Sequence, residues 1–465
     1  MLSNTIYAIV YFNHSPISTF MAIHPIEYRY GNPEMKAVWN EETRLRKMLA
    51  VETALAKAEE FTGYIPEGKD DKIAAGADKV VLERVKEIED EIHHDVMAVV
   101  LALAEQSGDG GKWVHFGATS NDILDTATAL QIKDAILILR KETAKLRSIL
   151  LDMALSHKNT VCAGRTHGQI GVPTTYGLRF AIWASEIDRH IERLDQLAPR
   201  ATAGKMSGAV GTQAAFGTKG IEIQEKTMEF LGIEAADVSN QIIQRDRHAE
   251  FVMWMANIAT TLDKVCIEIR SLARSEIAEV EEGFGKKQVG SSTMPHKRNP
   301  IKSEQVCGLA RIVRAMVEPE LCNNTLWDER DLTNSSCERI VFPESCVLTD
   351  HIIRLTTTII QNLRFYPENI RKNLNLLNGL NMGEAIMIEL SKKGVGRQEA
   401  HEIVRECAMS ARETGSHMKD ALIKNKTVSK YLTEKEIISQ MNPDNYIGTA
   451  VIQVESLVTK LKIRK

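Results

Sequence analysis

Apolar residues recur with helical spacing over unusually long stretches of this 465-residue chain. In residues 121–163, which contain no glycine or proline, isoleucine, leucine and methionine return at intervals of three, four and seven positions. Such spacing defines one face of an α-helix, and roughly 40 residues of helix span about 60 Å. A second stretch of this kind covers residues 233–282, where we expect the helix to begin near Gln244. The pattern predicts a bundle of long helices.

Two more stretches, residues 179–197 and 336–363, show the same pattern, and we expect Pro343 to start or kink the second helix. Short alternating runs typical of strands are sparse, and we find no repeat of about 20–50 residues. Aromatic residues are only 5% of the chain, and its 28 glycines and 12 prolines are few, which favours helices over strands. We therefore predict an all-α fold.

Breaks in the helical pattern divide the chain into three predicted helical domains. We place an N-terminal domain at residues 21–120, a central long-helix bundle at 121–364 and a C-terminal domain at 365–465. Residues 1–20 are apolar but lack the basic start and the continuous apolar run of a signal peptide. Because Met21 opens a more typical protein sequence, we interpret residues 1–20 as a disordered extension or an upstream start.

Charge and cysteine content narrow the classes of function. The chain has 58 lysines and arginines against 62 acidic residues, so no global basic excess exists to bind nucleic acid or an anionic membrane. Its seven cysteines show no CxxC spacing, which predicts reduced thiols in a cytoplasmic protein. No apolar run approaches the roughly 20 residues that span a bilayer. Phosphate-loop, dinucleotide-binding, HExxH and GxSxG motifs are also missing from the sequence.

Polar residues and glycines gather between the predicted helices, where catalytic residues often lie. In residues 283–300, glycines let backbone N–H groups approach an anion, Lys297 can hold a carboxylate or phosphate, and a nearby serine can act as base or nucleophile. A flexible polar connection explains this composition equally well. In GRTHGQ, His167 is a candidate proton-transfer residue, although a surface or helix-capping histidine is the commoner case.

A pair of arginines with a hydroxyl between them suggests phosphate binding. Arg330 and Arg339 flank Ser335, and guanidinium groups suit the oxygens of a phosphate. The acidic residues of the same segment could instead pair with these arginines in a solvated network, which the sequence supports equally.

These segments together resemble a known family. GSSTMPHKRNP at residues 290–300 is similar to the signature loop of the fumarase/aspartase lyase superfamily, and VHFGATSND and GRTHGQ precede it in the family's order. The resemblance extends over nearly everything from Met21 onward and is greatest to the adenylosuccinate lyase family. Four further segments carry it: YRYG at 28–31, HHDV at 93–96, NQIIQRDRH at 240–248 and LWDERDLTNSSCER at 326–339.

The resemblance implies a homotetramer whose central helices form a twenty-helix core, with each active site shared by three subunits. It implies a carbon–nitrogen lyase that eliminates fumarate from adenylosuccinate and from succinylaminoimidazole carboxamide ribotide in purine synthesis. The reaction needs no cofactor and no metal. The expected partners are the purine nucleotide substrate and other copies of the chain, with no nucleic acid and no membrane.

The resemblance also assigns catalytic roles. Ser291 matches the base, which becomes strong enough only when its loop closes over Lys297 and backbone N–H groups. His167 matches the acid that protonates the departing purine nitrogen, assisted by a carboxylate such as Glu304. His94 matches a second active-site histidine.

The remaining predicted site residues bind the substrate. Thr119, Ser120, Lys297 and Asn299 are expected at the succinyl end, and Gln241 at the polar middle. The resemblance further implies that the nucleotide phosphate is bound by Arg29, Tyr30, Arg330, Ser335 and Arg339. The set is completed by His93, Asp95, His115 and Ser292.

Two alternatives remain at this point. Some 3-carboxy-cis,cis-muconate cycloisomerases of the same superfamily resemble the loop down to MPHKRNP, whereas the paired arginines, YRYG and HHDV favour the nucleotide lyase. A catalytically silent helical scaffold is the other alternative. A scaffold has no need of Ser291, Lys297 and His167 together, which argues against it.

Overall fold

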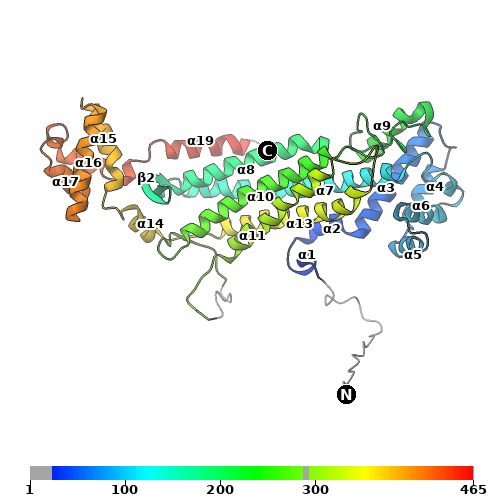
Figure 1. Ribbon diagram of the computed structural model, residues 1–465, viewed down its shortest axis with the longest axis horizontal. Helices are drawn as coiled ribbons and strands as arrows, with labels where there is room; N and C mark the ends of the chain where they lie inside the picture. The colour runs from blue at the N-terminus through cyan, green and yellow to red at the C-terminus, as the bar shows by residue number, and fades with distance from the viewer. Residues whose placement is uncertain (1–22, 286–292, 464–465) are drawn as a thin grey trace, which may run out of the picture.

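A rod of long helices forms the centre of the molecule (Figure 1). The structure is a computed structural model that describes residues 23–285 and 293–463. Its longest helix, α7 (Ser120–Ser156), has 37 residues and spans roughly 55 Å. The other members of the rod are α8 (Tyr176–Ala201), α10 (Asp246–Leu272), α11 (Ile301–Ala315), α13 (Thr333–Gln361) and α19 (Ala450–Ile463). The predicted all-α class is confirmed.

The rod is held together by the apolar faces that the sequence pattern predicted. Leu139 of α7, Leu262 of α10 and Ile352 of α13 have no solvent exposure and belong to one hydrophobic core. Burying a side chain of this size contributes roughly 1.5–3 kcal/mol each. Pro343 lies inside α13, because this helix already begins at Thr333. Of the two expectations for Pro343, that it starts this helix or that it kinks it, the first is wrong.

The chain after α7 (Ser120–Ser156) differs from the predicted long helix. Residues Val161–Thr166 and Gln169–Thr175 form an antiparallel hairpin, β1 and β2. Thr166 pairs with Gln169, and the two residues between them, His167 and Gly168, have φ values of 53° and 75°. Two consecutive positive φ values are the mark of a type I′ turn, which matches the twist of a hairpin.

Smaller helices form a second hydrophobic core at one end of the rod. Leu55, Leu103 and Ile123 are among its nearly fully buried members. The elements at this end are α3 (Glu41–Phe61), α4 (Asp70–Ala77), α5 (Leu82–Ile92), α6 (Asp95–Gln106) and α9 (Gly220–Leu231), together with the short 3₁₀ helices at 108–113 and 217–219. The short helices α1 (Pro25–Tyr28) and α2 (Pro33–Trp39) pack on the central core instead.

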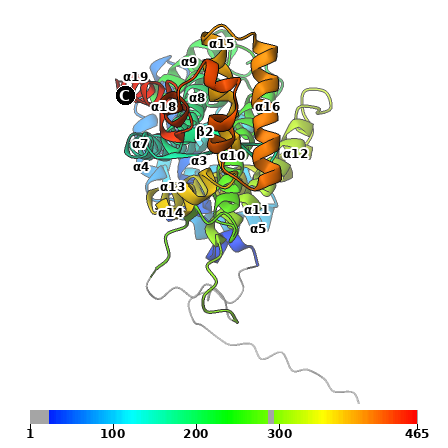
Figure 2. The same cartoon turned by 90° about the vertical axis from the view of Figure 1, so that its left-hand side faces the viewer.

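A third core lies at the opposite end, where Figure 2 shows α15, α16 and α18 facing the viewer. Its helices are α15 (Gly383–Lys392), α16 (Arg397–Thr414), α17 (Met418–Lys424) and α18 (Glu434–Gln440), with short 3₁₀ helices at 380–382, 428–430 and 443–445. The connecting elements are β3 (Val280–Glu281), α12 (Val317–Cys322), β4 (Arg364–Phe365) and α14 (Pro367–Leu374). The final helix, α19, returns to the rod, where Val454 and Val458 join the central core. The three domain boundaries stay a prediction.

Two further sequence expectations concern the whole chain. All seven cysteines lie within the described residues, and none forms a disulfide. Among helices of residues 23–285 and 293–463, none has the length and apolarity required to cross a membrane.

Candidate active site

A cavity of about 300 Å³ lies between α7 and α13 and is rich in guanidinium groups. Arg44, Arg245, Arg330 and Arg339 line it together with Ser335. Planar, permanently charged guanidinium groups suit the oxygens of a phosphate. The structure therefore brings together three residues that the sequence assigned to phosphate binding, Arg330, Ser335 and Arg339. The other two arginines were missed.

The start of α6 contacts two arginines of this cavity through Asp95. Arg339 Nη2 donates to Asp95 Oδ2 at 2.8 Å, and Arg44 Nη2 lies 3.5 Å from the same oxygen. Burial acts to raise the pKa of Asp95, but the hydrogen bonds from Arg339 and the Val96 amide and the nearby guanidinium charges lower it below its ordinary value. Asp95 thus stays ionised and orients both arginines, while their remaining N–H groups can bind substrate oxygens.

The two predicted histidines of HHDV sit just before Asp95. His94 is the N-cap of α6, and its Nδ1 accepts the Met97 amide at 3.2 Å. His93 ends α5 with a left-handed φ of 53°. Both side chains are exposed. Because Nδ1 of His94 already accepts an N–H, its Nε2 is the nitrogen that can carry a proton toward a ligand.

Arg330 also meets the residue predicted for the middle of the substrate. Its Nη1 donates to Gln241 Oε1 at 3.2 Å, and Gln241 Nε2 donates to the Ala209 carbonyl at 2.9 Å. Burial is the main cause that lowers the pKa of Arg330 from its high ordinary value, and the group remains a cation at neutral pH. The pair links the loop before α13 to the loop before α10.

The wall of the cavity contains a buried charge network that sequence reasoning missed. Arg245 donates through Nη2 to Asp125 at 2.9 Å and through Nε to Glu338 at 2.6 Å. These two carboxylates raise the pKa of Arg245, although burial opposes them. Arg245 lies within the NQIIQRDRH segment that carried the resemblance, but no local pattern indicated that its partners come from α7 and α13.

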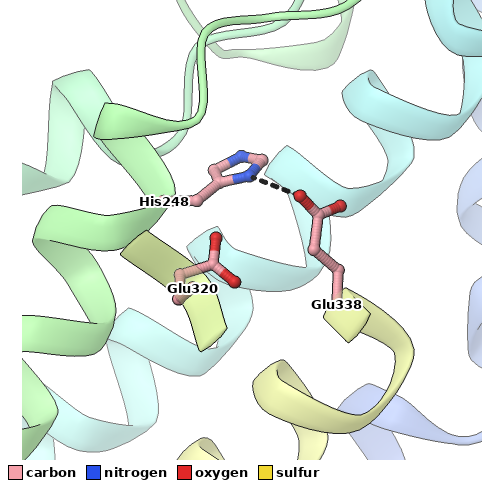
Figure 3. A group of neighbouring side chains, drawn as sticks. All are labelled: His248, Glu320 and Glu338. Carbon is pink, nitrogen blue, oxygen red and sulfur yellow. Dashed lines mark ion pairs between the residues drawn. The ribbon is translucent and has the colours of Figure 1, made fainter. Parts of the chain in front are cut away.

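Glu338 also belongs to a group that has the composition of a metal site (Figure 3). The potential ligand atoms of His248, Glu320 and Glu338 lie within 4.8 Å of one another. Arg245 already holds Glu338, however, and burial together with the charge of Glu338 raises the pKa of Glu320 to about 8. At neutral pH the Arg245 guanidinium therefore balances Glu338, and Glu320 is mostly neutral because it keeps its proton. The cluster suits a rigid wall behind the arginines better than a metal centre.

A turn and a helix start bring His115, Thr119 and Ser120 together. His115 has a positive φ of 62°, Thr119 is the N-cap of α7, and Ser120 is the first residue of that helix. The Thr119 amide donates to Asp122 Oδ2 at 2.9 Å. The start of a long helix carries a partial positive charge and favours a carboxylate. This arrangement suits the predicted binding of the succinyl end.

Arg29 and Tyr30 lie at the end of α1. The exposed Arg29 guanidinium is 5.9 Å from the centre of the Tyr30 ring. Tyr30 is half-buried and tilts against His351 of α13, with the ring centres 5.6 Å apart. The next amide, that of Gly31, donates to His351 Nδ1 at 3.3 Å. The segment is thereby fixed to α13, the helix that also carries Ser335 and Arg339.

The signature loop lines a second cavity, of about 700 Å³. Lys297, Asn299 and Glu304 line it together with Arg270 and Arg274 of the α10 end. The predicted base Ser291 and its neighbour Ser292 lie outside the described residues.

The predicted acid, His167, does not line the arginine-lined cavity. His167 is exposed at the tip of the hairpin. Its neighbours Thr166 and Gly168 line another cavity, which does not include Glu304. Ser271 and Arg274 line both cavities, whereas Glu304 lines only the cavity at the signature loop. Figure 1 shows β2 near one end of the rod and α6 at the other, so one chain does not unite His167 with the arginine-lined cavity.

Comparisons with known proteins identify the family. A family model described as "Lyase" matches residues 27–315, and one described as "Adenylosuccinate lyase C-terminus" matches residues 379–457. The chain is 54% identical over 449 residues to the adenylosuccinate lyase of Methanocaldococcus jannaschii, covering 96% of this chain and 97% of that protein. It is 56% identical over 440 residues to the adenylosuccinate lyase of Pyrococcus abyssi, and the match covers 94% of this chain and 98% of that protein.

The chain belongs to the adenylosuccinate lyase family. The resemblance drawn from the signature loop is thereby confirmed. Solved structures agree on the fold: a 3-carboxy-cis,cis-muconate lactonizing enzyme from Pseudomonas putida matches with a TM-score of 0.85 and 29% identity over 94% of this chain and 99% of its own. A fumarate lyase from Mesorhizobium sp. BNC1 matches with a TM-score of 0.85 and 30% identity, and the match covers 92% of this chain and 98% of that chain. The identity to the lactonizing enzyme, 29%, is well below the 54–56% to the two adenylosuccinate lyases, which favours the nucleotide lyase over the cycloisomerase alternative.

Proposed function

We propose that the protein cleaves adenylosuccinate to AMP and fumarate, and succinylaminoimidazole carboxamide ribotide to its carboxamide and fumarate, in the cytoplasm. Identity of 54–56% to relatives named adenylosuccinate lyase, over nearly the whole of both chains, carries this proposal. The arginine-lined cavity supports it, because both substrates present a phosphate and the cavity offers four guanidinium groups.

The proposed chemistry is an anti elimination. Ser291 removes a proton from the succinyl carbon next to a carboxylate, and the extra negative charge develops on that carboxylate. Lys297, Asn299 and the start of α7 at Thr119 supply cations and N–H groups for this charge. The C–N bond then breaks, fumarate leaves, and His167 gives a proton to the purine nitrogen. All of these steps use side chains and backbone groups, without a cofactor.

We further propose that the active site is shared between subunits of a homotetramer. Within one chain, His167 and the arginine-lined cavity lie toward opposite ends of a rod whose longest helix has 37 residues. An acid and a phosphate site this far apart cannot act on one nucleotide. Packing of several rods side by side in opposite directions, as in a twenty-helix core, would bring one chain's hairpin to another chain's cavity.

Turnover of adenylosuccinate by the purified protein, followed by ultraviolet absorbance with fumarate identified as product, tests the reaction. Cleavage with fumarate release supports the proposal. A folded protein that releases no fumarate would overturn it, and 3-carboxymuconate would then be the substrate to test next.

Mixing of two inactive variants tests the shared site. His167→Gln and Ser291→Ala are each expected to be inactive as pure proteins. After subunit exchange, about a quarter of the sites in an equal mixture would combine two intact residues, if the residues come from different chains. Activity near that fraction supports shared sites. Inactivity after exchange has been demonstrated with tagged chains would contradict them.

A further inference from the structure

A buried carboxylate on α3 holds the ring of His115. Glu52 Oε1 lies 2.7 Å from His115 Nδ1, and the Glu52 side chain is only 1% exposed. No side-chain hydrogen bond to Nε2 of this ring is found among the residues that the structure describes. Because Glu52 is joined to one nitrogen of the ring, the other nitrogen is the one available to a ligand.

The backbone around His115 is also fixed. His115 and Gly117 both have positive φ values, 62° and 76°. A Cβ added to Gly117 would lie 2.7 Å from Phe216 Cε1, so the turn packs closely on this ring. The turn runs directly into Thr119 and Ser120 at the start of α7. The orientation of the His115 ring relative to this helix start is therefore set by the turn and by Glu52.

The charges around His115 favour its protonated form. Burial acts to lower the pKa of His115, but the charge and hydrogen bond of Glu52 and the charge of Asp122 raise it. Asp122 is itself paired with Lys205, whose Nζ lies 2.5 Å from Asp122 Oδ1. The remaining acid, Glu59, is fully buried, and burial and the charge of Glu52 raise its pKa to about 9. Glu59 is thus neutral at pH 7, which leaves Glu52 as the carboxylate that His115 balances.

We propose that Glu52 is a positioning residue that holds the His115 ring by Nδ1 and presents Nε2–H to the succinyl carboxylate of the substrate. The inference rests on the proposed function, since it assigns a partner to one residue of that site. Glu52 does not touch the substrate and acts only through His115. With Nε2–H in place, the turn offers a charge-assisted N–H donor and the start of α7 offers a helix dipole to one carboxylate.

Glu52→Gln is the test, because it preserves the shape of the side chain and removes its charge. We expect KM for adenylosuccinate to rise about tenfold at pH 7.5 with a smaller change in kcat, as for loss of a hydrogen bond to a charged group. We also expect the alkaline limb of the kcat/KM profile to move to lower pH by about one unit, because His115 loses its proton more easily without the carboxylate.

Glu59→Gln is the matched control, since it makes the same change in an equally buried residue of the same helix. It should leave KM at pH 7.5 and the part of the pH profile below pH 8 unchanged, because burial and the charge of Glu52 raise the pKa of Glu59 to about 9 and keep it uncharged there. In a His115→Asn background, Glu52→Gln should add no further loss. If Glu52→Gln fails to fold, Glu52→Asp, which shortens the side chain and weakens the contact but keeps the charge, should raise KM while moving the alkaline limb less.

Two results would overturn the inference. One is an unchanged KM and alkaline limb in a folded Glu52→Gln protein. The other is the same shift in Glu59→Gln, which would indicate a general disturbance of α3. Absence of adenylosuccinate cleavage by the wild-type protein would instead contradict the proposed function, so the two failures are distinguishable.

Discussion

Lys205 and Asp122 form an ion pair in which neither side chain has any solvent exposure, with Nζ 2.5 Å from Oδ1. Lys205 Nζ also donates to Ser207 Oγ at 3.0 Å, and the Ser207 amide donates to Asp122 at 2.8 Å. Asp122 further accepts the Thr119 amide, so the pair joins the loop before α9 to the start of α7. The start of this helix depends on a buried charge that is fully paired.

Lys205→Met is expected to destabilise the protein by about 3–5 kcal/mol, because it leaves the Asp122 carboxylate buried without its cation. Urea unfolding followed by circular dichroism measures this free energy. The double variant Asp122→Asn/Lys205→Met should recover part of the loss, since no unpaired charge remains. A loss below about 1 kcal/mol in the single variant would contradict the assigned role of the pair.

Glu59→Gln is expected to stabilise the protein at alkaline pH. Burial, with the charge of Glu52, raises the pKa of Glu59 to about 9 in the folded state, well above its ordinary 4.5. Folding therefore takes up a proton between these two values, and wild-type stability falls as pH rises through this window. The penalty at pH 8 is on the order of 4 kcal/mol, and it vanishes below about pH 4.5.

Thermal unfolding at several pH values provides the measurement for Glu59→Gln. The melting temperature of the variant should exceed that of the wild type at pH 8, and the difference should shrink steadily toward pH 5. An equal difference at both pH values would mean that Glu59 does not change protonation on folding.

Ser291→Ala is expected to abolish turnover while substrate binding is preserved, because the proposed base is required only for proton removal. Turnover assays and equilibrium binding of adenylosuccinate measure the two effects separately. Ser292→Ala is a suitable control from the adjacent position. Turnover near the wild-type rate in folded Ser291→Ala would remove this residue from the role of base.

Arg339→Ala is expected to raise KM for adenylosuccinate by about tenfold or more, because it removes a cation from the phosphate cavity and leaves Asp95 with one guanidinium partner. Steady-state kinetics give KM and kcat separately. Arg371→Ala is the matched control, since Arg371 forms a similar exposed pair, with Asp444, in the C-terminal part of the chain. An unchanged KM would assign Arg339 a structural role only.

Helical periodicity predicted the rod well, because a buried helix face repeats along the sequence. The stretch beginning near Gln244 forms α10 from Asp246, and residues 179–197 lie within α8. Periodicity failed at residues 161–163, which begin β1 instead of continuing the helix, and it did not predict the hairpin that follows. The signal there was the dipeptide His167–Gly168, both of which adopt a positive φ in a two-residue hairpin turn. A short hairpin between long helices has few other sequence features from which it could be predicted.

The candidate site was predictable where a motif contains neighbouring residues. Thr119 and Ser120 adjoin at a helix start, and Arg330, Ser335 and Arg339 line one cavity. Glu52 and Arg245 could not be found in this way, because each acts through a residue far along the chain that only folding brings close. Glu52 lies in the middle of α3 and Arg245 at the start of α10, and no local pattern at either position distinguishes a buried ion pair from a solvated one.

The 37 residues of α7 also constrain how the length of this chain can change. Insertion of one residue near its middle would turn everything beyond it by about 100°, so the apolar face beyond the insertion would leave the core. An insertion of about seven residues returns the face to within roughly 20°, at the cost of about 10 Å of extra length. Relatives can therefore vary the surface of this helix freely one side chain at a time, whereas changes of its length are tolerated only in steps of about two turns, made together in every helix packed beside it.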